Sequence, residues 1–129
     1  GEPYRHVRER PTTPGAWLIT LRSVPRHFKA LREAIESTGD AHVWFGEELT
    51  YIRGKGVCTF RVEVTGFTWL EALYRRWAEL ERADAFPFDI DLYLHNTQWA
   101  ASLRESTPEQ IEEIIRSNAP TYQPAVDGA

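Results

Sequence analysis

FPFDIDLYLHN, residues 86–96, decides the fold, because hydrophobic and polar side chains alternate along it without a break. Phe, Ile, Leu and Leu occupy the even positions 88–94, while the odd positions hold Asp89, Asp91, Tyr93 and His95. Successive side chains of a β-strand point to opposite faces of its sheet, so this pattern predicts a strand with one dry face and one wet face. The wet face is either a solvated surface, a reactive site or a surface for a partner.

The flanking segments supply the other elements of the predicted fold. Short apolar or alternating runs predict strands at 16–22, 41–52 and 56–64, the last two joined as a hairpin through the glycines of RGKG. Helical spacing of apolar residues predicts helices at 24–39, 68–84 and 106–118. Helix-capping residues mark their starts: Ser23 for the first, Thr68 with Glu71 for the second, and Thr107 with Gln110 for the third.

The order β-α-β-β-α-β followed by a helix predicts an α+β fold. Two right-handed β-α-β units that share one sheet give a ferredoxin-like sandwich with a four-stranded antiparallel sheet, here with an added C-terminal helix. Both crossing helices then cover the face to which the apolar alternates point. The opposite face is left open, and it carries the aspartates and the histidine of residues 86–96.

Composition and length indicate a single domain. Residues 1–14 hold three prolines and several charges, which predicts a flexible N-terminal arm, and residues 119–129 read as a flexible C-terminal tail. A single α+β domain is expected over 15–118. A lone cysteine, Cys58, excludes an internal disulfide, and no apolar run approaches the roughly 20 residues of a membrane span. We therefore expect a cytoplasmic protein.

A half-exposed sheet needs polar side chains outside, but one feature of the wet face counts against a merely solvated strand. Aspartate is disfavoured in strands, and Asp89 and Asp91, two positions apart, lie roughly 7 Å from each other. They repel each other unless a cation lies close by, and Arg61 is the candidate neighbour, with Glu63 beside it on the third strand. These residues belong to the predicted binding surface.

A catalytic role for the same face is the alternative hypothesis. His95 would act as general acid or base, oriented by Tyr93 and Asp91 of its own strand and by His42 of another. Asp91 and His95 are four residues apart, roughly 13 Å along a strand, so they need help from other strands. This would be a cofactor-independent enzyme of the dimeric α/β-barrel type, an isomerase, cyclase or monooxygenase; we expect no cofactor and no metal site.

A binding role is the leading hypothesis, since the chain has no P-loop, nucleophile-elbow or dinucleotide motif. Five tryptophans are many for 129 residues, and Trp44 and Trp99 lack an obvious place in the core. Exposed aromatic side chains beside a polar sheet face are typical of an interface or a ligand pocket. We expect a small cytoplasmic binding or regulatory protein whose open face and aromatic rim hold a protein partner, a second copy or a small molecule.

The net charge of −4 bears on the choice of partner. It argues against nucleic acid, and it would suit an immunity or antitoxin-type protein that faces a basic toxin.

Overall fold

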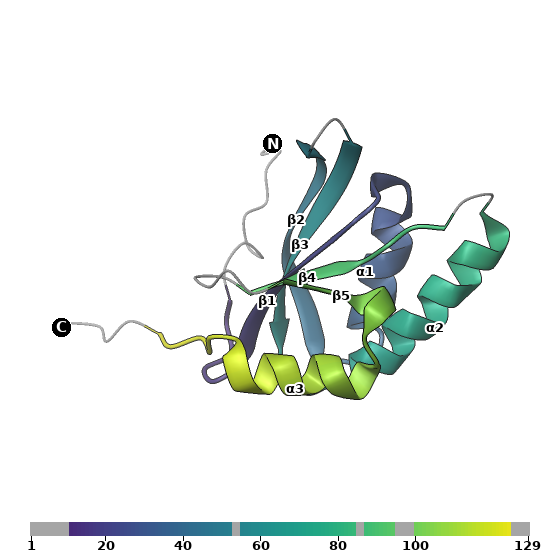
Figure 1. The fold of residues 1–129 in the computed structure, drawn as a ribbon. Helices are drawn as coiled ribbons and strands as arrows, with labels where there is room; N and C mark the ends of the chain where they lie inside the picture. The colour runs from purple at the N-terminus through teal and green to yellow at the C-terminus, as the bar shows by residue number, and fades with distance from the viewer. Residues whose placement is uncertain (1–10, 53–54, 85–86, 95–99, 125–129) are drawn as a thin grey trace.

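The computed structural model describes residues 11–52, 55–84, 87–94 and 100–124, without the side chains of 45–52 and 55. It shows an α+β fold with a five-stranded antiparallel sheet (Figure 1). The strands are β1 (Trp17–Ser23), β2 (Ala41–Ile52), β3 (Lys55–Val64), β4 (Asp91–Tyr93) and β5 (Ala100–Ser102). The helices are α1 (Phe28–Glu36), α2 (Thr68–Ala83) and α3 (Pro108–Asn118), with short 3-10 turns η1 (Pro25–His27) and η2 (Leu103–Glu105).

The strands follow the order β2-β3-β1-β4-β5 across the sheet, so the prediction of four strands is wrong. The fifth strand comes from the link after β4, where Ala100–Ser102 pairs antiparallel with Asp91–Tyr93. Three small residues carry no alternation of hydrophobic and polar side chains, and the strand-like pattern that would have revealed them is therefore missing.

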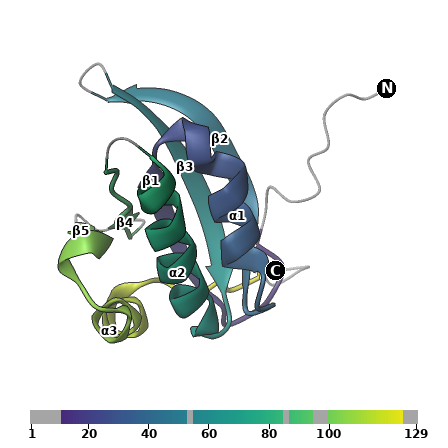
Figure 2. The ribbon, with the colours of Figure 1, turned by 90° about the vertical axis from the view of Figure 1, so that its right-hand side faces the viewer.

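Helices α1 and α2 lie side by side on one face of the sheet, and α3 lies below it beside the start of α2 (Figures 1 and 2). The core fills the space between the two helices and the sheet. Its largest fully buried side chains come from every layer: Leu21, Leu31, Ile35, Phe60, Trp69, Leu70, Leu73, Ile90, Leu92, Leu103, Ile111 and Ile115.

The alternation predicted for residues 87–94 is confirmed. Phe88, Ile90, Leu92 and Leu94 are each exposed by 4% or less. The odd positions between them, from 87 to 93, are partly or fully exposed. Hydrogen-bonded strand pairing covers only Asp91–Tyr93 of this stretch, but its side chains keep the period of two on either side.

Helix α2 is capped from a distance rather than by its own first turn. The carboxylate of Asp40, in the turn before β2, accepts hydrogen bonds from the backbone N–H of Thr68 at 2.8 Å and of Trp69 at 3.2 Å, and from the Thr68 hydroxyl. The predicted capping box of Thr68 with Glu71 is therefore wrong. The capping box of Thr107 with Gln110 is confirmed.

Ser23 does not cap α1 either, because it is the last residue of β1 and its hydroxyl donates to the carbonyl of Asp89 at 2.9 Å. That bond ties the end of β1 to the approach of β4. The helical path begins with η1 instead, after Val24.

Two tryptophans of α2 lie in the core. Trp77 was expected there, and its indole Nε1 donates to the carbonyl of Phe88 at 2.9 Å. Trp69, which the helical spacing places off the core stripe, is fully buried, and its Nε1 donates to the carbonyl of Gly66 at 3.0 Å. The turn before α2 folds back over this first-turn residue, which a helical projection does not capture.

The chain after α3 returns to the sheet. Leu18 donates from its backbone N–H to Pro120 at 2.9 Å, and Tyr122 donates to Ala16 at 2.8 Å. This stretch lies within the predicted C-terminal tail and pairs with the part of β1 that β4 does not reach. Among the described residues, no helix is long and apolar enough to span a membrane.

Candidate functional site

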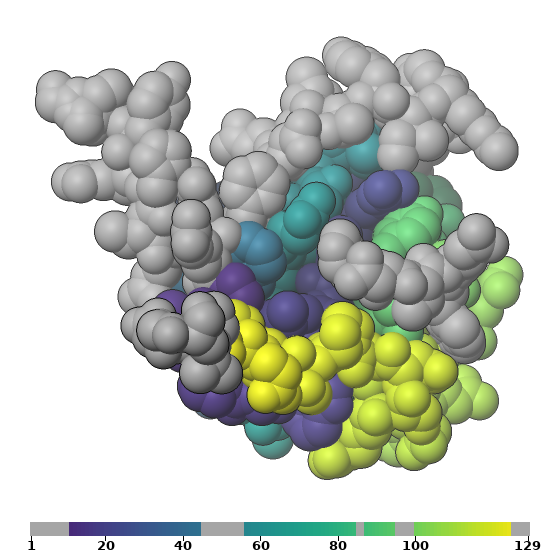
Figure 3. Space-filling view, turned by 90° about the vertical axis from the view of Figure 1, so that its left-hand side faces the viewer, coloured from purple at the N-terminus to yellow at the C-terminus, as the bar shows by residue number. Residues whose placement is uncertain are grey.

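The face of the sheet opposite α1 and α2 carries the polar alternates of four strands. Their registers line them up in rows, because directly paired residues of neighbouring strands share a face. Thr20 pairs with Arg61 on one side and Tyr93 on the other, and Arg22 pairs with Thr59 and Asp91. Figure 3 looks onto this face, where β1 (purple) and β3 (teal) lie above the yellow C-terminal part of the described chain. We call this surface the open face.

Arg22 lies on the open face near the end of β1, the middle strand of the sheet. Its guanidinium carbon is 4.2 Å from the centroid of the Tyr93 ring, so the charged group lies over the aromatic face. Its Nε is buried, and among the described residues it has no hydrogen-bond partner. Asp91 pairs with Arg22 across the strands, but no hydrogen bond or close ion pair joins their side chains within the described part of the chain.

Asp91 is half-buried beside this arginine. Burial raises the pKa of the Asp91 carboxyl above its ordinary value, and the negative charge of Asp89 raises it further, while Arg22 acts in the opposite direction. The carboxylate therefore takes up a proton more readily than an ordinary aspartate. A group of this kind in a cavity is a candidate for binding or proton transfer.

A cavity of about 470 Å³ opens beside Arg22, at the end of β1 and the start of β4. Its volume lies within the range of small-ligand pockets. Its walls combine apolar side chains with two arginines and both wet-face aspartates. The lining residues are Arg22, Ser23, Val24, Arg26, Gly56, Val57, Pro87, Phe88, Asp89, Asp91 and Tyr93.

A second, smaller and more apolar cavity of about 220 Å³ lies nearer the start of β1, between Trp44 and Arg61. Pro11, Leu18, Ile19 and Thr20 complete its walls. The indole Nε1 of Trp44 is buried there without a hydrogen-bond partner among the described residues. A buried donor without an acceptor costs about 1–3 kcal/mol, so an acceptor brought by a ligand would be favourable at this place.

Glu63, predicted as part of the binding surface, has a structural role on the open face. It is only 4% exposed, and its carboxylate accepts hydrogen bonds from the backbone N–H groups of Thr12 at 2.9 Å and Thr13 at 2.7 Å. It thereby holds the segment before β1 against the sheet. Its negative charge is satisfied within the chain.

Asp89 is also engaged within the chain. Its carboxylate accepts a hydrogen bond from Arg104 Nε at 2.7 Å, and the same guanidinium pairs with Glu81. Arg104 also donates to the carbonyl of Phe88 at 2.8 Å. Asp89 therefore anchors the approach to β4 to the turn after β5, at the edge of the open face.

His42 lies far from the predicted acid–base group. It is on β2, and β3 and β1 separate β2 from β4, which puts His42 roughly 14 Å from the strand of Asp91. Its Nδ1 lies 2.9 Å from the carboxylate of Glu36 at the end of α1, and its Nε2 has no hydrogen-bond partner among the described residues. His95 and Trp99 lie outside the described residues.

Arg22 is the residue that sequence reasoning missed. The structure brings Arg22 together with Asp91 and Tyr93. The alternation in residues 86–96 predicts Asp91 and Tyr93 on this face, whereas the apolar composition of AWLITLR predicts only a strand. The signal was present: Leu18, Thr20 and Arg22 alternate with Ile19 and Leu21, which are buried.

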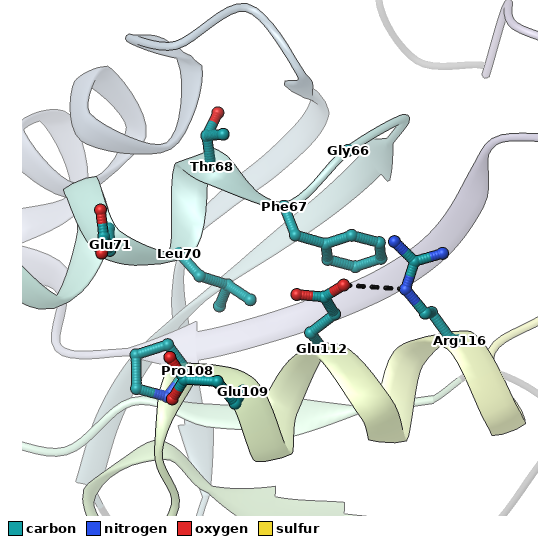
Figure 4. A pocket seen from close by; sticks show the side chains of 9 residues that line it. All are labelled: Gly66, Phe67, Thr68, Leu70, Glu71, Pro108, Glu109, Glu112 and Arg116. Carbon is teal, nitrogen blue, oxygen red and sulfur yellow. Dashed lines mark hydrogen bonds and ion pairs between the residues drawn. The ribbon is translucent and has the colours of Figure 1, made fainter.

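A third cavity, of about 370 Å³, lies between the start of α2 and α3, away from the open face (Figure 4). Its one arginine, Arg116, lies over the ring of Phe67 at 4.6 Å and donates to Glu112 at 2.8 Å. Glu71 and Glu109 add two carboxylates. The arginine is already paired inside the chain, so the open face remains the better candidate site.

No group of three or more His, Cys, Asp or Glu side chains among the described residues could hold a metal ion. No family model matches the chain, and no curated protein or solved structure gives a significant match.

Proposed function

We propose that this chain is a small binding or regulatory protein that holds a protein partner, or a second copy of itself, on the open face. One observation carries the proposal. Arg22 is half-buried with its guanidinium over Tyr93, and its buried Nε has no hydrogen-bond partner among the described residues. Charged groups that leave water are normally paired, and a partner that brings an acceptor would complete this one.

Two features of the open face support the same function. It offers two neighbouring cavities of about 470 and 220 Å³, the first lined by both charged and apolar side chains and the second mainly by apolar ones. It also presents aromatic side chains, Trp44 and Tyr93, which are enriched at protein interfaces. Interface hot spots are enriched in tryptophan, tyrosine and arginine and cluster in well-packed pockets.

We also propose a ferredoxin-like arrangement for the first four strands with α1 and α2. The element order and the strand order β2-β3-β1-β4 support it. A cytoplasmic location, the default for a chain with a single cysteine, stays part of the proposal.

Site-specific photo-crosslinking in the source cells tests the binding function. A p-benzoylphenylalanine at position 57 replaces Val57, which lines the larger cavity, and a control places the same group at the exposed Glu33 on α1. We expect a discrete protein adduct from position 57 and none from position 33. The adduct should disappear when Trp44→Ala is added, while circular dichroism shows an unchanged fold. Failure to form an adduct at position 57, or equal adducts from both positions, contradicts the proposal.

A second candidate function is the cofactor-independent enzyme of the dimeric α/β-barrel type. It is favoured by the raised pKa of Asp91 in a cavity that Tyr93 also lines. This function requires a dimer that closes the open face into a chamber. Sedimentation velocity separates the two candidates, because a monomer at all concentrations removes the enzyme and leaves the binding protein.

A further inference from the structure

Resting on the proposed function, we infer that the partner presents an extended segment with a single acidic side chain: its carboxylate pairs with Arg22, and an apolar side chain two residues away fills the cavity beside Trp44. This names the chemistry of the partner, which the proposed function leaves open.

The need for a carboxylate follows from the state of Arg22. An arginine guanidinium carries five N–H donors in a planar fork that matches a carboxylate. Stacking on Tyr93 holds this fork in one orientation at 4.2 Å from the ring, which reduces the rotamer entropy lost on binding. Within the described part of the chain, no carboxylate lies in hydrogen-bond contact with it.

The other charges around Arg22 are already used. Arg26, in the wall of the same cavity, donates to Asp84 at 3.0 Å. Asp89 is bound to Arg104, and Glu63 holds the backbone of Thr12 and Thr13. Among the described residues, Asp91 is the remaining carboxylate beside Arg22, and burial together with the charge of Asp89 raises its pKa, which disfavours its negative charge there. The partner group that complements Arg22 is therefore an anion.

The spacing between acidic and apolar side chains follows from the strand. Arg22 lines the larger cavity, while Thr20, two residues earlier on β1, lines the apolar cavity beside Trp44 and Arg61. Two residues of a strand span about 6.6 Å. An extended partner segment that runs along β1 presents its own side chains toward the face at the same interval. The pattern to expect is one apolar residue and one acidic residue separated by a single position.

Charge favours protein over nucleic acid as the carrier of this anion. The larger cavity holds Asp89 and Asp91, which repel a run of phosphates, and the whole chain has a net charge of −4. The smaller cavity has mainly apolar walls, which suit an aliphatic or aromatic side chain better than a phosphate.

A displayed library of random dodecapeptides, selected on the full chain, tests the inference. We expect the enriched peptides to carry Asp or Glu separated by one position from Leu, Ile, Phe or another large apolar residue. Loss of a charge-assisted hydrogen bond costs about 1.5–3 kcal/mol, so Arg22→Gln should weaken the binding of a selected peptide by about tenfold or more. Arg82→Gln makes the same change of charge on the exposed side of α2 and should leave binding unchanged.

A gain of affinity provides a second check that misfolding cannot imitate. Asp91→Asn removes the carboxylate that competes for Arg22 and should strengthen the binding of the same peptide. A thermal unfolding curve for each variant confirms that the fold is kept.

Four results overturn the inference: no peptide enriched over the starting library, enriched peptides without an excess of acids, equal binding by Arg22→Gln, or an oligouridylate bound more tightly than every peptide and dependent on Arg22. Peptides that need Trp44 but carry no acid would remove the acidic side chain while leaving the open face as a protein-binding surface. An absent crosslink from position 57 in cells removes the binding function itself.

Discussion

Replacing Asp40 with alanine tests how the sheet and the second helix are joined. The Asp40 side chain satisfies two of the free N–H groups at the start of α2, those of Thr68 and Trp69, from a turn 28 residues earlier in the chain. Loss of an N-cap side chain costs about 0.5–2 kcal/mol, and loss of a negative charge at a helix N-terminus costs about 0.3–1 kcal/mol. Asp40 is partly exposed, so we expect Asp40→Ala to lower the free energy of unfolding by about 1.5–2 kcal/mol.

The assay is urea unfolding followed by tryptophan fluorescence, with thermal unfolding as a second measure. For a domain of this size, the expected loss corresponds to a fall in Tm of about 5–8 °C. Asp40→Asn keeps an acceptor oxygen and loses the charge, so its destabilisation should be smaller, about 0.5–1 kcal/mol.

The pH dependence gives the prediction its sharpest form. Burial raises the pKa of Asp40, but the hydrogen bonds from Thr68, Thr38 and Trp69 outweigh burial and lower the pKa below its ordinary value of 3.8. A carboxyl with a lowered pKa in the folded state stabilises the fold at all pH values above its unfolded pKa, and this stabilisation is lost as the pH falls through the folded pKa. The difference between wild type and Asp40→Asn should therefore stay constant from pH 7 to about pH 5 and shrink below about pH 4. A destabilisation by Asp40→Ala of less than about 0.5 kcal/mol, or a difference from Asp40→Asn that grows on acidification, would refute the reasoning.

Three further predictions concern groups that the fold buries or tethers. Burial, with a contribution from Glu109, raises the pKa of Tyr74 to about 12, so ultraviolet titration should show one tyrosine that ionises at a higher pH than the others. This late transition should be absent from Tyr74→Phe, and an unchanged late transition in that variant contradicts the assignment. A Cβ at Gly66 would lie 2.9 Å from Asp40 Oδ2, so Gly66→Ala should destabilise the fold by about 1 kcal/mol or more. In a double-mutant cycle the same substitution should cost less in an Asp40→Ala background, whereas additive effects argue against the contact. Glu63→Gln weakens the bonds to Thr12 and Thr13, so amide hydrogen exchange at these two residues should accelerate by about tenfold, whereas unchanged protection shows that the segment is held by something else.

The strand-like alternation of residues 86–96 was the most informative feature of the sequence, because period two reports directly which side chains leave water. It placed Phe88, Ile90, Leu92 and Leu94 in the core and left Asp91 and Tyr93 on the open face. The α+β class followed from the order of the elements.

The errors share a physical cause, namely contacts that the periodicity of a single element does not report. Asp40 caps α2 in place of Thr68, and β5 forms only because β4 offers it an edge. Trp69 is buried by the turn before α2, although its helical phase points elsewhere. A sequence reports local propensity and periodicity, whereas these features depend on which surfaces meet after folding.

The candidate site was predicted in part. Asp91 and Tyr93 lie where the alternation put them, and Trp44 and Arg61 line one cavity on the same face. His42 is separated from them by two strands, since pairing order within a sheet is not encoded in any single strand. Arg22 was missed because the prediction for β1 rested on its apolar composition and not on the alternation of side chains between the two faces of the sheet.

The crosslink yield from position 57, compared with that from position 33, tests most directly whether the open face is the working surface of this protein. We expect a discrete adduct from the open face that depends on Trp44, and none from the helix-covered side. Adducts that form equally from α1, or that persist after Trp44→Ala, would contradict it.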